Sequence, residues 1–233
     1  MSKRNGIFIG SIFILGLIIF IYPHVAQQVN NHIQKSEAIA FHSEAKTLPP
    51  EVKHEKIQAA RECNEAIFTN EDGLSDPFTE GYNPLDYQEC MKAMQDEETI
   101  DMGTIASIEI PKLGLHIPIH LGADEAALSQ GVGQVEGSSL PVGGPSTHTV
   151  LAGHRGMGTK EMFRHLDELQ PGDVFYIHTL DEKIEYEVYD TNVILPYETG
   201  SLKIQNDKDL ATLLTCHPYR SDTHRLVVHG ERK

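Results

Sequence analysis

The chain has 233 residues, of which 39% are hydrophobic and 23% charged, values that argue against wholesale disorder and allow one substantial core with appendages. Its 19 lysines and arginines stand against 34 aspartates and glutamates, a formal net charge of −15. Such a surface repels a polyanion, so we expect no nucleic acid as partner and interpret the acidity as a source of solubility.

The N-terminus differs from the rest of the chain. Lys3 and Arg4 precede an apolar stretch over residues 7–22. A helix that crosses a bilayer needs about 20 apolar residues, so this stretch is short, and a cleaved signal peptide is the alternative. The bond after Ala26 lacks a preceding pair of small residues and is a poor cleavage site. We therefore expect residues 1–23 to form an uncleaved, single-pass anchor in the lipid bilayer, with a cytoplasmic N-terminus and an extracytoplasmic remainder.

Residues 24–100 have a helical pattern that prolines and glycines interrupt. Pro49 and Pro50 separate the first two helical stretches, and proline suits the first turn of the second. A turn-rich segment follows at 70–84, with glycine or proline at four positions. The sequence predicts a helical juxtamembrane region, with helices over residues 24–46, 51–68 and 85–94.

From residue 101 onward, short runs rich in β-branched and aromatic residues alternate with turn residues. Many strands in about 130 residues favour a closed barrel, because closure removes exposed sheet edges. Short helices are expected at 124–128 and 161–169. The sequence thus predicts a mainly β domain over 101–233. Seven runs are interpreted as strands: 105–110, 116–120, 147–152, 174–178, 184–194, 211–215 and 225–229.

The three cysteines, Cys63, Cys90 and Cys216, are an odd number for an extracytoplasmic protein. One thiol left over is either reactive or paired with another molecule. Cys63 and Cys90 bracket the turn-rich segment, and a disulfide between them would close a loop of 27 residues. Unpaired thiols at both positions are an equal alternative, because disulfide geometry cannot be read from sequence.

Cys216 ends an apolar run and is followed by loop residues, Pro218 and Ser221 among them. A thiol at a strand end is held rigidly and is accessible. A nucleophilic cysteine needs a nearby base or cation, because an isolated thiol is mostly protonated at neutral pH. Arg225 lies nine positions further on, so a hairpin-like excursion would return it beside Cys216. There it could also stabilise an oxyanion.

His154 stands at the end of another apolar run, in Ala152-Gly153-His154-Arg155-Gly156. Glycines on both sides permit the close approach of a substrate or of neighbouring backbone. The chain has 13 histidines, and a single one is more often structural than catalytic. His154 is therefore a candidate acid and base only in combination with Cys216 and Arg225.

Together these motifs resemble the sortase family of cysteine transpeptidases. Its signature pairs a strand-end Thr-Leu-x-Thr-Cys with a downstream arginine, matched here by Thr212-Leu213-Leu214-Thr215-Cys216 and Arg225, and the likeness extends over residues 100–231. It implies a closed eight-stranded sortase-type barrel without a cofactor, with Cys216 as nucleophile, His154 as acid and base and Arg225 as oxyanion-binding group. Only seven strands are recognised, so the eighth is either missed or merged with another run, and 184–194 is the expected place for a merged strand.

The turn-rich segment contains Asp76-Pro77-Phe78. This motif is similar to the lid of class C, or pilus, sortases, which implies that Asp76 pairs with Arg225 while Phe78 covers Cys216. An ordinary turn is the alternative, since Asp-Pro often begins one. Many pilus sortases also carry a C-terminal membrane segment, whereas this sequence stops at Lys233. Either such a segment follows in a longer protein, or the N-terminal helix is the sole membrane tether.

The resemblance implies a Gram-positive cell-surface enzyme that cleaves LPxTG-like sorting signals of pilin subunits. It would join the acyl group to a lysine amine of another pilin and so polymerise pili. Two other functions are weighed: a housekeeping sortase that anchors surface proteins to peptidoglycan, and a catalytically silent scaffold that binds pilins.

Metal binding at the nucleophile is a further alternative. Cys216, His217 and His229 have zinc-binding side chains, but adjacent residues of an extended strand point to opposite faces. The sequence also has no dense carboxylate loop for calcium. We therefore expect no metal.

Overall fold

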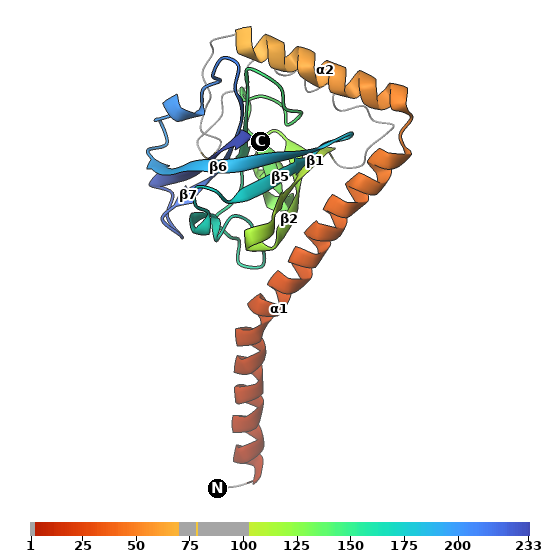
Figure 1. Ribbon diagram of the computed structural model, residues 1–233. Coiled ribbons are helices and arrows are strands. Elements are labelled where there is room, and N and C mark those ends of the chain that lie inside the picture. Colours follow the sequence, from red (N-terminus) through yellow and green to blue (C-terminus); the bar gives the residue numbers. More distant parts are fainter. Residues whose placement is uncertain (1–2, 70–77, 79–102) are drawn as a thin grey trace.

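The computed structural model begins with two long helices joined by a short turn (Figure 1). α1 ends at Thr47 and α2 takes Pro50 as its first residue, as the prolines predict. The expected helix at 85–94 lies outside the described residues, as does the turn-rich segment apart from Phe78. These two helices are α1 (Lys3–Thr47) and α2 (Pro50–Thr69). The structure describes residues 3–69, 78 and 103–233.

α1 is one helix that includes Pro23 and joins the apolar stretch to the polar stretch after it. By length and composition it can cross a membrane: its most apolar window has a mean hydropathy of 2.2 and is entirely unburied. Figure 1 shows its N-terminal part projecting away from the barrel. Exposed side chains such as Phe8 and Phe13 would be unfavourable in water and suit a lipid environment.

The strands between residues 104 and 232 form a closed barrel in the order β1-β2-β3-β4-β7-β8-β6-β5. The pairs β2–β3 and β4–β7 are parallel, and the other neighbouring strands are antiparallel. The predicted fold class, an eight-stranded barrel behind a helical region, is confirmed. The strands are β1 (Thr104–Ile110), β2 (Leu115–Leu121), β3 (Val132–Gln134), β4 (Thr147–Ala152), β5 (Val174–His178), β6 (Lys183–Ile194), β7 (Asp209–His217) and β8 (His224–Arg232).

The strand that the sequence analysis missed is β3, which pairs with β2 and β4. Its expected location within 184–194 was wrong, because β6 is one continuous strand that pairs first with β5 and then with β8. Three residues, of which Gly133 is the middle one, are too few to show an alternation of apolar and polar side chains.

Short helical segments connect the strands. The expected helix near 124–128 is present as α4 (Glu125–Gln130), where the Asp124 carboxylate accepts a hydrogen bond of 2.8 Å from the Ala127 N–H. Of the helix expected at 161–169, only the 3-10 turn Leu166–Glu168 is helical, and an α-helix over the whole range is not formed. Met162 has a φ of 48°, which no α-helix allows, and the segment forms turns that bury Met162 and Phe163 completely. The 3-10 turns are η2 (Pro111–Leu113), η3 (Leu166–Glu168) and η4 (Gly200–Leu202).

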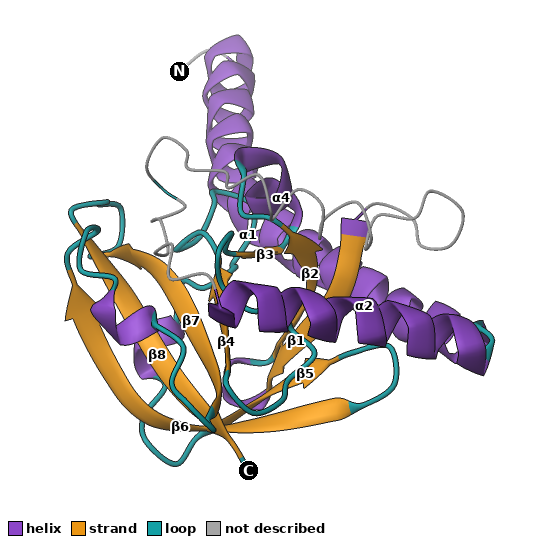
Figure 2. Cartoon of the chain, turned by 90° about the horizontal axis from the view of Figure 1, so that it is seen from above, coloured by secondary structure: helices purple, strands orange, loops and turns teal. Residues whose placement is uncertain are grey.

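The two N-terminal helices pack on the barrel. α2 crosses over one end of the barrel (Figure 2), where the Asn64 amide donates to the Leu140 carbonyl and accepts from the Leu140 N–H. Phe41 of α1 and Ile57 of α2 belong to one buried cluster with Leu180. These contacts make the C-terminal half of α1 and all of α2 part of the folded unit.

One of the two cysteines in the described part of the chain is in a disulfide, and the other is not. Cys63 is disulfide-bonded, and its proposed partner Cys90 lies outside the described residues. Cys216 keeps its sulfur as a thiol.

Candidate active site

Cys216 lies at the end of β7, opposite Arg225 at the start of β8 in the antiparallel register. The residue is half-buried, and the pairing of β7 with β8 holds its backbone in place. The preceding residue fixes the strand end, because the Thr215 hydroxyl donates a hydrogen bond of 2.7 Å to the Gly153 carbonyl. The loop from 218 to 223 returns the chain so that Arg225 takes the strand position opposite Cys216.

Arg225 is 2% exposed. A buried guanidinium is costly unless its N–H groups are bonded, and here Nη1 donates to the Asp222 carbonyl at 2.7 Å and to the His224 carbonyl at 3.1 Å. The loop between β7 and β8 thus supplies the acceptors that orient the charge. The result is a fixed positive charge on β8, the strand that pairs with β7.

His154 follows β4, which runs parallel to β7 with Ala152 opposite Leu214. The Gly153 N–H donates to the Leu214 carbonyl at 3.0 Å and extends this pairing by one residue. His154 follows Ala152 by two positions, and Cys216 follows its partner Leu214 by two positions. The two residues therefore lie at the same level on neighbouring segments. Gly153 is required, since a Cβ there would lie 2.8 Å from the Phe163 ring.

The His154 ring is available for chemistry. Within the described part of the chain, its buried Nε2 makes no hydrogen bond, and the Glu125 carboxylate lies 3.8 Å away on an exposed side chain. A substrate group could reach this nitrogen without displacing a strong partner.

The Phe78 ring lies near Arg225 and His154. Its centroid lies 5.0 Å from the guanidinium carbon of Arg225 and 6.3 Å from the centroid of the His154 ring. The ring also packs on the buried apolar cluster that contains Leu214 and Val227. Asp76 and Pro77, the other residues of the expected lid, lie outside the described residues.

The sequence analysis missed Arg155 as a site residue. Its Nη1 donates to the Cys216 carbonyl at 3.4 Å and to Nδ1 of His217 at 2.5 Å, while Nη2 pairs with Asp167 at 2.9 Å. Burial, and then the positive charge of Arg155, lower the pKa of His217. The only signal in the sequence was the position of Arg155 directly after His154.

The structure does not gather Cys216, His217 and His229 as one ligand set. Nδ1 of His217 faces Arg155, whereas Nδ1 of His229 is hydrogen-bonded to the Thr212 hydroxyl at 2.7 Å. Three other histidines do converge, at the contact between α1 and the barrel.

A closed barrel that brings a thiol, an imidazole and a guanidinium to adjoining strand ends has the architecture of a cysteine transpeptidase. The Sortase domain model matches residues 108–233, so the chain belongs to the sortase family. Among curated proteins, Sortase D of Bacillus subtilis is 30% identical over 128 residues, which are 54% of this chain and 62% of that protein. Sortase A of Listeria monocytogenes is 29% identical over 128 residues, 54% of this chain and 55% of that protein. The chain therefore spans less than two thirds of these relatives.

Solved structures extend the likeness beyond the barrel. Sortase C of Streptococcus pneumoniae has a TM-score of 0.74 and 34% identity, covering 84% of this chain and 95% of that one. A pilus-related sortase C of Group B Streptococcus has a TM-score of 0.73 and 36% identity, covering 83% and 95%. Sortase C-1 of Actinomyces oris has a TM-score of 0.71 and 40% identity, covering 79% and 99%. Because the family match covers only residues 108–233, these coverages include part of the helical region.

Proposed function

We propose that the chain is a class C, pilus-assembling sortase, in which Cys216 is the nucleophile, His154 the acid and base, and Arg225 the oxyanion-binding group. The observation that carries this proposal is the antiparallel pairing of Cys216 with Arg225 beside the strand that leads to His154. The solved sortase C structures, one of them described as pilus-related, support the class.

The proposed reaction has two acyl-transfer steps. The Cys216 sulfur attacks the carbonyl carbon of the threonine in an LPxTG-like sorting signal, and negative charge develops on the carbonyl oxygen. Arg225 stabilises that charge. His154 protonates the glycine nitrogen as the Thr–Gly bond breaks, leaving a thioester on Cys216. A lysine amine of a second pilin then attacks the thioester and loses a proton to His154. The thiolate leaves, and an isopeptide bond has formed.

Arg225 also prepares the nucleophile. A positive charge close to a thiol favours its thiolate form, the form that attacks carbonyl carbon. Two carbonyl acceptors fix this guanidinium, so the charge need not reorganise during the reaction.

We propose further that residues 76–78 are an autoinhibitory lid, with Asp76 paired to Arg225 and Phe78 lying over the thiol. The contacts of the Phe78 ring with Arg225 and His154 support this role. A closed lid limits the access of water to the thioester and makes opening a condition for substrate binding.

The proposed location is the Gram-positive cell surface, with the N-terminal helix in the membrane and the barrel outside. Lys3 and Arg4 before the apolar stretch favour a cytoplasmic N-terminus. The exposed apolar face of α1 supports the bilayer as its surroundings. Pilin subunits with sorting signals and acceptor lysines are the proposed partners.

Mass spectrometry of the full chain in detergent, incubated with an LPxTG peptide, tests this function. We expect the mass of a thioacyl adduct on the parent and none on Cys216→Ala. Product formation with a pilin lysine peptide, rather than with a peptidoglycan-type amine, would separate pilus assembly from a housekeeping role. A parent chain that binds the peptide without forming an adduct would be a silent scaffold and would refute the proposal.

A further inference from the structure

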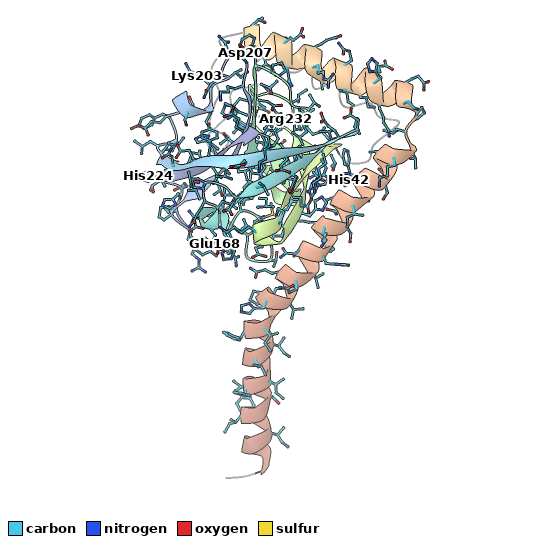
Figure 3. All side chains as sticks on the ribbon, in the orientation of Figure 1. His42, Glu168, Lys203, Asp207, His224 and Arg232 are labelled. Carbon is cyan, nitrogen blue, oxygen red and sulfur yellow. The ribbon has the colours of Figure 1, made fainter. Side chains whose placement is uncertain are left out.

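Three histidines from three different elements meet beside the barrel. His42 belongs to α1, His116 to β2 and His178 to the end of β5. Each histidine offers one ring nitrogen, and these three nitrogens all lie within 4.8 Å of one another. All three residues are half-buried. Figure 3 labels His42 on the part of α1 that runs along the barrel. The cluster is separate from the proposed active site, whose residues come from β7, β8 and the loop after β4.

The three rings are close enough to act on one another. The His42 and His178 centroids are 4.5 Å apart, and the His116 and His178 rings stack at 5.2 Å. Burial lowers the pKa of all three side chains, that of His116 to about 4, and the positive charge that His178 can carry adds to the effect on His42 and His116. A neutral imidazole has the lone pair that binds a metal.

The polar neighbours orient the rings. Ser107 Oγ lies 3.1 Å from Nε2 of His42 and 3.0 Å from Nε2 of His116, so its hydroxyl bridges these two rings and can donate its proton to only one of them. The Glu109 carboxylate lies 2.8 Å from Nε2 of His178 and can only accept its proton. Nδ1 of His178 consequently carries the lone pair. A carboxylate that fixes a histidine tautomer in this way is typical of metal sites.

We infer that His42, His116 and His178 form a binding site for one zinc ion, with Glu109 orienting His178. Zinc accepts neutral imidazoles in tetrahedral geometry, with bonds of about 2.0–2.1 Å that place the nitrogens roughly 3.4 Å apart. The three nitrogens lie within 4.8 Å of one another, so small rotations of the rings suffice to reach this spacing. The fourth position suits a water molecule or the Ser107 hydroxyl.

The surroundings allow access and set the strength of the site. A cavity of about 340 Å³ between α1 and β2 is lined in part by His116 and gives an ion a path to the cluster. Lys183 pairs with Glu109 at 2.8 Å, and its charge and that of Lys46 help to lower the pKa of His42. These charges disfavour a cation, so we expect moderate rather than extreme affinity.

A metal here would have a structural consequence. Its ligands would join the helix that leads to the membrane to two strands of the barrel. Zinc would therefore restrain the barrel relative to α1, without contact with Cys216. The inference is independent of the proposed transpeptidase activity.

The test is zinc binding by the full chain in detergent, without a polyhistidine tag and in a Cys216→Ala background that removes the competing thiol. We expect one zinc per chain by competition with a chromophoric chelator. Cobalt should give the intense visible absorption of a tetrahedral site. Glu109→Gln should weaken binding by about 10–100-fold, and His42→Ala or His116→Ala by at least as much. His54→Ala, at an exposed position of α2, is the matched control and should bind as the parent does.

Zinc-dependent thermal unfolding guards against misfolded variants. Zinc should raise the melting temperature of the parent and of His54→Ala but not that of His42→Ala, because only a ligand of the native state stabilises it. Unchanged zinc affinity in both His42→Ala and His116→Ala would overturn the inference. So would a parent chain whose melting temperature does not respond to zinc.

Discussion

The guanidinium carbon of Arg225 lies 5.0 Å from the centroid of the Phe78 ring, so the aromatic ring covers the proposed oxyanion-binding residue. A cation–π contact of this kind contributes about 0.5–2 kcal/mol. If residues 76–78 are the proposed lid, a contact of this size would favour the closed state and still allow substrate to capture the open one.

Removal of this contact should expose the thiol. We expect Phe78→Ala to increase the reaction rate of Cys216 with a small thiol reagent by about two- to thirtyfold, which corresponds to the free energy of the contact. Asp76→Ala combined with Phe78→Ala should raise it further, together with hydrolysis of a sorting-signal peptide. Phe68→Ala, which removes an exposed aromatic ring from α2, serves as control. A rate equal to that of the parent in the double variant would mean that residues 76–78 are an ordinary surface turn.

Arg225→Lys should be severely impaired although it keeps the positive charge. The guanidinium donates to two carbonyls and presents further N–H groups in a fixed plane, whereas an ammonium has a different reach. We expect kcat/KM for peptide cleavage to fall by about 10²–10³, as for the loss of an oxyanion donor. Arg232→Lys makes the same change in an exposed ion pair of β8 and should leave the rate unchanged. Activity within a few-fold of the parent would exclude a direct role for Arg225.

Arg155 is expected to position the nucleophile strand without touching the substrate. It joins the Cys216 carbonyl and His217 to Asp167. Arg155→Lys should lower kcat by about 10-fold or more with little change in KM, because small misplacements of reacting groups are costly. Asp167→Asn should have a weaker effect in the same direction, and Arg61→Lys, on the exposed face of α2, should have none. A change confined to KM would show that Arg155 binds substrate instead.

His148 should make stability depend on pH. Its Nδ1 donates to the Lys203 carbonyl at 3.0 Å, so Nε2 must accept from the Thr212 hydroxyl at 2.7 Å. Burial lowers the pKa of His148 from 6.5 to about 4. The folded state therefore binds fewer protons than the unfolded state between these values. The stabilising contribution is complete above pH 6.5 and is lost as pH falls toward 4.

The corresponding experiment compares urea unfolding at pH 7 and pH 5. One pKa unit corresponds to about 1.4 kcal/mol, so the parent should lose on the order of 2 kcal/mol through His148 over this interval. His148→Gln should lower the free energy of unfolding at both pH values. The difference in that free energy between pH 7 and pH 5 should be smaller than in the parent by about 2 kcal/mol. His54→Gln should keep the difference of the parent. An unaltered difference in His148→Gln would show that His148 is protonated in the folded state or that other groups compensate.

The sequence by itself determined the features that depend on neighbouring residues. The apolar run before residue 23 predicts the helix that is found, and the breaks at Pro49 and Pro50 fix where α1 ends and α2 begins. Alternating β-branched residues predicted seven of the strands and, with the motif around Cys216, the closed barrel. The closeness of Cys216 and Arg225 also followed, because a short loop between two strands must return the chain to the adjacent position.

Only the tertiary structure decided features that depend on distant segments. β3 is too short to form without β2 and β4 beside it, and the buried turns around Met162 replace a helix because the barrel interior is filled from that segment. Arg155 meets Asp167 and the Cys216 carbonyl, and His42 meets His116 and His178, across long stretches of chain. Local patterns cannot encode such contacts, since closure of the barrel and docking of α1 bring together side chains whose types are individually unremarkable in sequence.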